Sequence, residues 1–334
     1  MSGTSPIDLF ALIRAQLFYQ VPASTASFAG QTVLVTGGNA GLGRELIKQL
    51  LEHDVDRVLL ACRTLSKGET AKQELQRQTG SRAEIQVLQV DMASFASVIA
   101  FAEHLKAVPR IDAAVLNAGV WPTGQETSEG FETTLTVNLI GTYLLAHLLL
   151  PRLQDTSEKF NTIARLCLIS SGLHKFATLE ARKSLSNRNL LDAMTAQPLR
   201  SKADYDARYQ DSKMLLNMYG QRLGHSYVQR HGKGVSTILV NPGFCVSSLD
   251  PPTTFGAKLF QRVLARSGPE GARHFLDAID VRKAAERNGA YITECMSAPH
   301  ASFIGTPEGI EVTDRLQKDL EQVLERVKPG VTVI

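Results

Sequence analysis

The residues with the clearest chemical potential are a tyrosine and a lysine, Tyr209 and Lys213, which stand four positions apart in the stretch YQDSK. In a helix this spacing puts both side chains on one face. A free tyrosine has a pKa of about 10, so its phenol needs a neighbouring cation to act as an acid–base group. Tyr205 is a weaker candidate, because the residue four positions after it is Tyr209 and not a lysine. The pair predicts proton transfer by Tyr209, with Lys213 supplying the charge.

A second chemical feature is the glycine-rich turn at residues 36–43, TGGNAGLG, which follows a β-branched run and opens a helical pattern. Glycines permit positive φ and let the main chain approach a pyrophosphate at the positive end of a helix. Tight strand–helix turns also use glycine, but the strand–turn–helix context favours nucleotide binding. The predicted cofactor-binding residues of this turn are Gly37, Asn39, Gly41, Leu42 and Gly43.

Strands that alternate with helices must position these groups. Apolar runs typical of strands occur at residues 32–37, 57–63, 85–92, 111–119, 164–171 and 234–243, and helical patterns of ten or more residues separate them. A further strand is expected near residues 301–305. This alternation predicts βαβ units, and nearly continuous apolar strands indicate a sheet covered on both faces. We therefore predict an α/β fold: one doubly wound Rossmann-type domain with a parallel sheet of about seven strands.

Composition excludes several other classes of protein. The chain has 334 residues, of which 43% are apolar and 21% charged, as in an ordinary globular protein. The net charge of +3 gives no reason to expect nucleic acid as a partner. Its four cysteines lie far apart with no CxxC pair, which argues against a metal site and against a disulfide framework. This pattern suits a reducing compartment, and we expect a cytoplasmic protein.

The N-terminal stretch also lacks the features of a signal peptide, because Asp8 and Arg14 interrupt its apolar residues. No stretch reaches the ~18 apolar residues of a transmembrane helix. Residues 7–19 could form an amphipathic helix with Leu9, Leu12, Ile13 and Phe18 on one side. Such an arm either packs over the core or lies on a membrane surface.

The spacing TGxxxGxG resembles the short-chain dehydrogenase/reductase family, and seven elements follow the family's order across about residues 32–248. The resemblance implies hydride transfer between a nicotinamide cofactor and a carbonyl or alcohol group. It implies catalysis by Tyr209, Lys213, Ser171 and Asn138, with Ser170 as a close alternative to Ser171. Ser171 would hold and polarise the carbonyl oxygen. Asn138 would anchor a water beside Lys213, and Lys213 would also hold the nicotinamide ribose.

Further cofactor contacts are predicted for residues that directly follow the expected strands. An acid after the second strand binds the ribose hydroxyls of NAD, whereas an arginine accommodates the 2′-phosphate of NADP. Arg63 stands there with Lys67 four residues later, so we predict NADP(H) as the cofactor. The resemblance implies that Asp91 and Met92 touch the adenine, that Asn117, Ala118 and Gly119 stabilise the sheet beside the cofactor, and that Pro242, Gly243, Cys245 and Ser247 hold the nicotinamide carboxamide. Cys245 has no histidine partner in its motif, which disfavours a role as nucleophile.

The separation of 38 residues between Ser171 and Tyr209 is long for the family. Together with the ACR…KGE pattern at residues 61–69 it resembles the retinol-dehydrogenase-like branch, which is similar to fungal biosynthetic reductases, including ketoreductases of secondary metabolism. This likeness implies a lipophilic small-molecule substrate. We expect an N-terminal arm at 1–30 and one domain at 31–334. Within that domain, residues 172–204 form an insert, either a wall of the substrate site or a solvated loop, and residues 249–300 look like a mobile lid.

Two alternatives to a redox enzyme remain open at this point. One is a regulatory protein of the same fold that binds NADP without turnover. The other is a different reaction on the same scaffold, such as epimerisation. The family resemblance also makes a homodimer possible.

Overall fold

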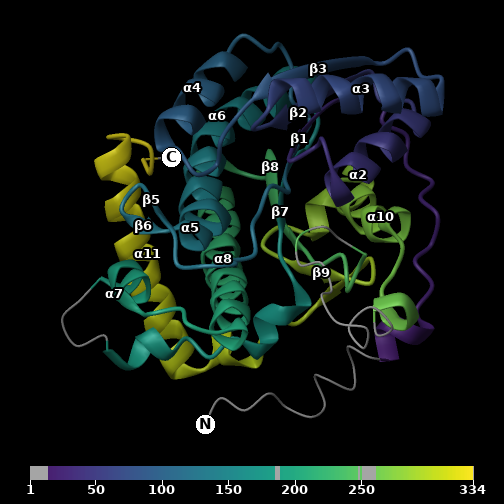
Figure 1. The fold of residues 1–334 in the computed structure, drawn as a ribbon. Helices are drawn as coiled ribbons and strands as arrows, with labels where there is room; N and C mark the ends of the chain where they lie inside the picture. Colours follow the sequence, from purple (N-terminus) through teal and green to yellow (C-terminus); the bar gives the residue numbers. More distant parts are fainter. Residues whose placement is uncertain (1–13, 185–188, 247–248, 250–260, 334) are drawn as a thin grey trace.

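An eight-stranded sheet runs through the protein in the order β10-β9-β8-β7-β4-β1-β2-β3 (Figure 1). The structure is a computed structural model, and it describes residues 14–184, 189–246, 249 and 261–333. The strands of the sheet are β1 Thr32–Thr36, β2 Arg57–Cys62, β3 Glu84–Gln89, β4 Ala113–Leu116, β7 Ala164–Ile169, β8 Val235–Val240, β9 Tyr291–Thr293 and β10 Met296–Ala298. All neighbours pair in parallel except β10, which is antiparallel to β9. A separate ribbon pairs β5 Thr127–Ser128 with β6 Phe131–Glu132.

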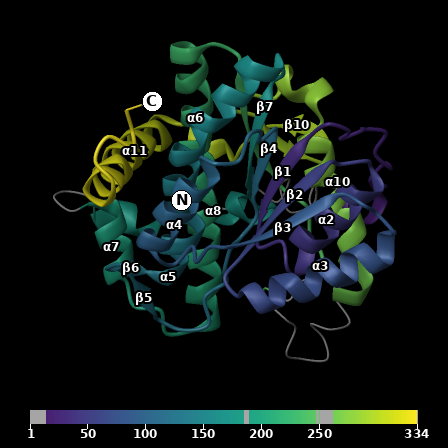
Figure 2. The same cartoon turned by 90° about the horizontal axis from the view of Figure 1, so that it is seen from above.

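Helices cover both faces of the sheet (Figure 2). Their bounds are α2 Gly41–Glu52, α3 Leu65–Thr79, α4 Phe95–Leu105, α5 Thr133–Leu135, α6 Thr142–Phe160, α7 Leu190–Ala196, α8 Lys202–His231, α10 Gly268–Ala278 and α11 Pro307–Val327. One apolar core joins the sheet to α4, α6, α8 and α11, and a second joins it to α2, α3 and α10. The predicted doubly wound α/β fold is thereby confirmed.

The sheet topology determines where a ligand can bind. β1 pairs with β2 on one side and with β4 on the other, so the chain reverses direction across the sheet at this point. In open α/β sheets the crevice beyond the carboxyl ends of the strands, at such a reversal, is the ligand site. Every residue of β1, β4, β7 and β8 is buried, as expected for strands covered on both faces.

One helical segment, Thr133–Phe160, is long and apolar enough to cross a membrane. It comprises α5, the π-helical stretch Thr136–Gly141 and α6. However, 89% of its most apolar window is buried inside the protein, so its apolar side chains belong to the core.

The expectation of a strand near residues 301–305 is wrong. Ser302–Gly305 forms a 3₁₀ helix, and the strand that extends the parallel sheet is β9, ten residues earlier. The main-chain N–H of Ala301 donates to Nε2 of His174, which ties this segment to the loop after β7 instead of to a strand. β9 was missed because only three residues pair, and they lie between Gly289 and the positive-φ residue Glu294.

The two expected additions to the domain are more deeply packed than their composition indicates. Within the 172–204 insert, α7 buries Leu190, Leu191 and Met194 and packs against α11, so this part is no solvated loop. Within the 249–300 range, α10 packs against α2, and β9 and β10 extend the sheet. Residues 250–260 lie outside the described part of the chain, so a lid in the 249–300 range stays a prediction.

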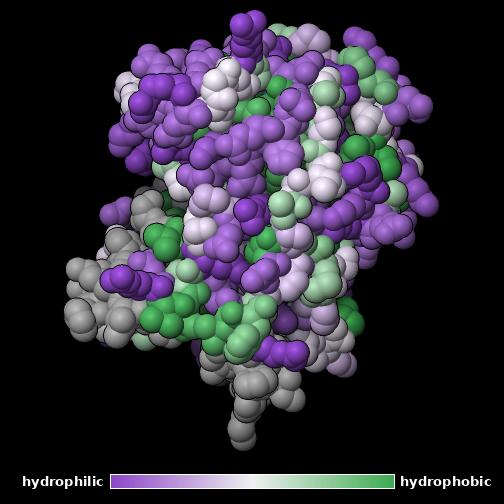
Figure 3. Space-filling model, turned by 90° about the vertical axis from the view of Figure 1, so that its right-hand side faces the viewer, coloured by the Kyte–Doolittle hydropathy of each residue, from purple (hydrophilic) through white to green (hydrophobic). Residues whose placement is uncertain are grey.

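The described part of the N-terminal arm begins with a short helix at residues 14–18, and residues 7–13 of the predicted amphipathic helix lie outside the described chain. Phe18 of its predicted apolar side is 78% exposed. The arm then runs along α10 to β1 (Figure 1), and Phe28 at its end is fully buried. Apolar side chains gather low on the face that carries this arm, beneath a mostly hydrophilic surface (Figure 3).

Candidate active site

A cavity of about 750 Å³ lies beyond the carboxyl ends of the central strands. It brings together most of the residues predicted from the sequence: Gly37, Asn39, Gly41, Leu42, Arg63, Lys67, Asp91, Met92, Asn117, Ala118, Gly119, Ser171, Tyr209, Lys213, Pro242, Gly243 and Cys245. Gly43 and Asn138 lie behind its wall, and Ser247 falls outside the described residues. Motifs spread over more than 200 residues therefore meet in one hollow.

The glycine turn forms one end of this cavity. Gly37 has φ +66°, and a Cβ there would lie 3.0 Å from Nδ2 of Asn117. At Gly43 a Cβ would lie 2.6 Å from the same atom, so this glycine serves the packing of α2 against the sheet. Gly41 has φ +54° and faces open space at the first residue of α2. The open position at a helix N-terminus is what an anionic pyrophosphate requires.

The segment after β4 is tied to this turn. Nδ2 of Asn117 donates to the Thr36 carbonyl over 2.9 Å, and the N–H of Ala118 donates to Oγ1 of Thr36 over 3.0 Å. Next to it, a Cβ on Gly141 would lie 2.5 Å from the Met92 carbonyl oxygen, so the loop after β3 lies directly against the helix that carries Asn138. These contacts fix the segments after β1, β3 and β4 relative to one another at the edge of the cavity.

Charge in the cavity is mostly positive. Among the described lining residues, the charged side chains are Arg63, Lys67, Lys213 and Asp91. Arg63 follows β2 directly, and both Arg63 and Lys67 are exposed at the cavity edge. Two exposed cations beside the second strand can bind a phosphate, and a guanidinium does so through paired hydrogen bonds.

Tyr209 and Lys213 lie at the opposite, buried end. α8 carries both, and each side chain is only 6% exposed. Nζ of Lys213 lies 5.7 Å from the centre of the Tyr209 ring and donates to the Ile169 carbonyl over 2.8 Å. The side chain of Ser171 is hydrogen-bonded to Tyr209. Oγ of Ser170 is buried in the cavity wall without a hydrogen-bond partner in the described chain, so it is Ser171 that meets the phenol.

Burial sets the protonation of these groups. Burial raises the pKa of Tyr209 to about 12, although the hydrogen bond from Ser171 acts in the opposite direction. Burial also lowers the pKa of Lys213 to about 8. At neutral pH the phenol therefore keeps its proton beside a mostly charged lysine, which is the state required of a proton donor.

Asn138 connects α8, which carries Tyr209, to the segment after β4. Its Nδ2 donates to the Val120 carbonyl over 2.9 Å and to Oγ of Ser212 over 3.2 Å, and its Oδ1 accepts from the N–H of Val120 over 2.9 Å. Oγ of Ser212 in turn donates to the Tyr209 carbonyl. The side-chain amide of Asn138 is thus occupied by protein partners. Asn138 itself lies in the π-helical stretch Thr136–Gly141, and its predicted role of anchoring a water stays a prediction.

The loop after β8 completes the site, and Asn241 organises it. Oδ1 of Asn241 accepts from the N–H groups of Gly172 and Gly243, over 2.9 and 3.1 Å, so it joins the serine loop to this one. Sγ of Cys245 points to the Pro242 carbonyl, and burial raises the pKa of its thiol to about 12. A thiol held protonated is a poor nucleophile, in keeping with the expectation from the sequence.

Sequence reasoning missed part of the lining. The structure adds a set of mostly apolar side chains from distant segments: Gln16, Trp121, Leu173, Phe176, Phe244, Leu249, Gln261 and Leu264. Trp121 stands two residues after the Asn117–Gly119 motif, which is a signal that could have found it. The others belong to no short motif, because they reach the cavity through tertiary packing.

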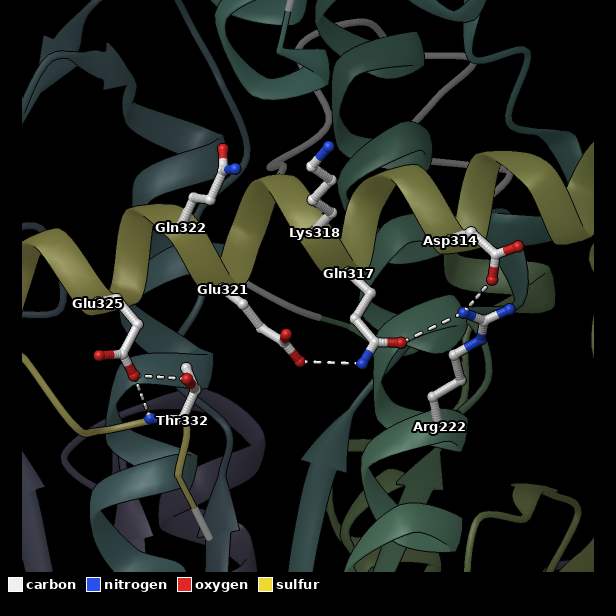
Figure 4. Close-up of a pocket in the computed structure, with 8 residues that line it drawn as sticks. All are labelled: Arg222, Asp314, Gln317, Lys318, Glu321, Gln322, Glu325 and Thr332. Carbon is white, nitrogen blue, oxygen red and sulfur yellow. Dashed lines mark hydrogen bonds and ion pairs between the residues drawn. The ribbon is translucent and has the colours of Figure 1, made fainter.

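A second hollow, of about 460 Å³, lies between α8 and α11 (Figure 4). Six of its polar side chains pair with one another: Arg222 with Asp314 and Gln317, Gln317 with Glu321, and Glu325 with Thr332. Groups that satisfy one another at a helix–helix contact serve packing, and we assign this hollow no chemistry.

Comparison with known proteins agrees with this geometry. The family model described as short chain dehydrogenase matches residues 31–171. The short chain dehydrogenase/reductase dmxR8 of Cryptosporiopsis sp. (strain 8999) is 33% identical over 322 residues, which are 95% of this chain and 98% of that protein. The chain belongs to the short-chain dehydrogenase/reductase family. A second member, the short-chain dehydrogenase anuD of Penicillium roqueforti (strain FM164), is 32% identical over 342 residues, covering 99% of this chain and 87% of the relative.

Solved structures of other proteins share the fold. The RhlG/NADP active-site complex of Pseudomonas aeruginosa aligns with TM-score 0.58 at 22% identity, over 80% of this chain and 95% of that one. The NADPH-bound carbonyl reductase from chicken fatty liver aligns with TM-score 0.57 at 22% identity, over 80% and 97%. The protein is an oxidoreductase of this family. The residues present would fit a nicotinamide cofactor, because Gly41 leaves open space at a helix N-terminus and the buried Oγ of Ser170 lines the cavity without a partner in the described chain.

Proposed function

We propose that this protein is an NADP(H)-dependent reductase that converts a ketone or aldehyde of a lipophilic small molecule to an alcohol, or catalyses the reverse. The observation that carries the proposal is the meeting of Ser171, Tyr209 and Lys213 at the buried end of a cavity whose other end is a glycine turn. A regulatory protein would not need a protonated phenol held beside a serine hydroxyl and an ammonium group.

The choice of NADP(H) over NAD(H) rests on Arg63 and Lys67. Both are exposed at the cavity edge just after β2, and the only carboxylate among the described lining residues is Asp91, after β3. A 2′-phosphate would be attracted by the two cations, whereas free ribose hydroxyls would lack the acid that usually receives them. Gly37, Asn39, Gly41 and Leu42 would hold the pyrophosphate.

The substrate class rests on the apolar part of the cavity lining. The side chains of Trp121, Leu173, Phe176, Leu249 and Leu264 contribute apolar surface to the cavity, and Trp121 stacks on Tyr209. Apolar lining with few polar groups is typical of sites for lipophilic ligands, because the polar groups orient the ligand and the apolar surface binds it. A carbonyl group would find its polar partners in Ser171 and Tyr209. The similarity to fungal relatives supports a role in fungal secondary metabolism.

The proposed mechanism assigns each side chain one task. A nicotinamide cofactor held in this cavity would supply the hydride for the carbonyl carbon. Ser171 holds the carbonyl oxygen by a hydrogen bond, which strengthens as negative charge develops on that oxygen. Tyr209 gives its proton to the oxygen, and the ammonium of Lys213 stabilises the phenolate that remains. Lys213 then passes a proton back to Tyr209, and Asn138 would hold the water that reloads it. In oxidation the same steps run backward.

The experiment is a panel of lipophilic ketones and aldehydes, followed by the loss of NADPH absorbance. The matched variants are Tyr209→Phe and Tyr205→Phe, which remove the same hydroxyl four positions apart on α8. We expect Tyr209→Phe to lose turnover by about 10²- to 10⁴-fold and to keep NADPH binding, while Tyr205→Phe stays active. A fully active Tyr209→Phe protein would refute the mechanism. NADPH binding without any turnover would favour the regulatory alternative, and product without NADPH consumption would favour epimerisation.

A further inference from the structure

The N-terminal arm contributes a side chain to the cavity, and that side chain is tied to the loop after β8. Nε2 of Gln16 donates to the Phe244 carbonyl over 2.6 Å and to the Leu264 carbonyl over 2.8 Å. Its Oε1 accepts from the N–H of Phe244 over 3.1 Å. One amide thus pairs with both main-chain groups of Phe244, as a neighbouring strand would, and also reaches the helical turn at residues 261–264.

A buried arginine fixes the arm from the other side of the same loop. Nη2 of Arg266 donates to the Ala15 carbonyl over 2.9 Å. The guanidinium also binds both carboxylate oxygens of Glu294, over 3.1 and 2.6 Å, and Arg266 is only 5% exposed. The N–H of Arg266 donates to the Phe244 carbonyl. The loop, the arm and β9's C-terminal end therefore share one hydrogen-bonded junction.

Phe244 and Val246 have little packing of their own within this loop. Phe244 is 40% exposed and Val246 is 53% exposed, although Cys245 between them is buried. Gly243 has φ +81°, and a Cβ there would lie 3.1 Å from Oε1 of Gln16 and still closer to Nη1 of Arg266. The main chain at Gly243 thus lies directly against the Gln16 and Arg266 side chains. With few apolar contacts at Phe244, the conformation of the loop at this residue depends on the hydrogen bonds to it.

This loop lies at the catalytic end of the cavity, so the hydrogen bonds that hold it act on the cofactor site. Gly243 and Phe244 line the same cavity as Ser171 and Tyr209, and Asn241 ties the loop to Gly172. Hydride transfer requires the nicotinamide ring at this end, so the loop is placed against the ring and not against the adenine. This step rests on the proposed function. We infer that Gln16 is a positioning residue of the cofactor site, through which the N-terminal arm holds the loop at residues 242–246 against the nicotinamide half of the cofactor.

Contacts along the rest of the N-terminal arm fix the position of Gln16. Val21 and Phe28 are buried, and Nη1 of Arg273 on α10 donates to the Val21 carbonyl over 3.0 Å. Nδ1 of His53 contacts the Ala26 carbonyl at 2.9 Å. The arm is therefore held along its length by contacts far from the cavity, and a change at Gln16 leaves them intact.

The test compares Gln16→Met with Gln20→Met in the full chain. Methionine has the length of glutamine but forms none of the three hydrogen bonds, and Gln20 is an exposed residue of the same arm. Each protein is titrated calorimetrically with NADPH and with 2′-phospho-ADP-ribose, which carries the 2′-phosphate and pyrophosphate but no nicotinamide ring. Thermal unfolding without ligand is recorded for each, and Gln16→Ala serves as a second variant.

We expect Gln16→Met and Gln16→Ala to weaken NADPH binding about tenfold and to change 2′-phospho-ADP-ribose binding by less than about twofold, with an unchanged unfolding temperature. Gln20→Met should match the wild type with both ligands. Equal NADPH binding by wild type and Gln16→Met would overturn the inference, as would an equal loss for both ligands, which would indicate a general loss of structure. A wild-type chain that does not bind NADPH would instead count against the proposed function.

Discussion

Trp121 and Tyr209 lie face to face, with ring centres 3.9 Å apart and planes inclined by 18°. The indole N–H of Trp121 donates to Oδ1 of Asp206 over 3.1 Å, and Nζ of Lys202 lies 5.1 Å above the same indole while it pairs with Asp206. Asp206 and Tyr209 are three residues apart on α8, so one turn of this helix holds both the tryptophan and the phenol. The stack fixes the plane in which the Tyr209 hydroxyl meets Ser171.

This stack predicts a positioning role for Trp121. Trp121→Leu removes the flat surface against Tyr209, and we expect the turnover number to fall about tenfold because misplaced reacting groups cost rate more than affinity. NADPH binding, measured by calorimetry, should change little. Trp121→Phe keeps a ring and should restore most of the turnover. If Trp121→Leu raised only the KM for the carbonyl substrate, the residue would be a substrate contact and not a positioning group.

Ser170 and Ser171 are adjacent, so their alanine variants form a matched pair that tests which hydroxyl polarises the substrate carbonyl. Ser171→Ala removes the hydroxyl that is hydrogen-bonded to Tyr209, and we expect turnover to drop about 10²- to 10³-fold, as for the loss of one donor to a developing oxyanion. Ser170→Ala removes a buried hydroxyl without a described partner and should cost much less. Single-turnover rates at saturating NADPH distinguish the two. The reverse order of effects would assign the role to Ser170.

The sequence predicted those parts of the site that sit in short motifs at strand ends. The turn at Gly37–Gly43, the Asn117–Gly119 segment and Ser171 each follow an apolar run, and parallel strands bring such ends to one edge. Tyr209 and Lys213 stood out by their helical spacing, and the resemblance to the family implied their roles and that of Ser171. Each of these residues lies in a short motif, so no knowledge of tertiary contacts was required to find it.

Other parts depend on tertiary packing and were not predictable from local pattern. Gln16 and Phe176 reach the cavity from segments whose sequence has no chemical signature, because their neighbours in space are far away in the chain. The insert looked polar and basic, yet Leu190 and Met194 of α7 are buried against other elements. A polar surface stretch with a few buried apolar residues is indistinguishable from a loop until its partner, here α11, is known.

Arg63 predicts the preference between the two cofactors. Arg63→Asp removes a guanidinium that would bind the 2′-phosphate and introduces repulsion, so we expect NADPH binding to weaken about tenfold to a hundredfold while NADH binding changes little. Arg77→Asp makes the same change of charge at an exposed position of α3 outside the cavity lining and serves as the control. Dissociation constants for both cofactors check this. An equal loss for NADPH and NADH with Arg63→Asp would contradict the assignment.

Lys213 predicts how cofactor affinity depends on pH. Burial lowers the pKa of its ammonium to about 8, whereas burial raises the pKa of Tyr209 and of Cys245 to about 12. If the ammonium donates to the nicotinamide ribose, the protonated form binds the cofactor better. The dissociation constant of NADPH should then stay constant below about pH 8 and rise above it, by at most about tenfold per pH unit. Lys213→Met should bind more weakly at neutral pH and lose this dependence. Calorimetric titrations from about pH 7 to about pH 9 test it, and a slope that persists in Lys213→Met would assign the titration to another group.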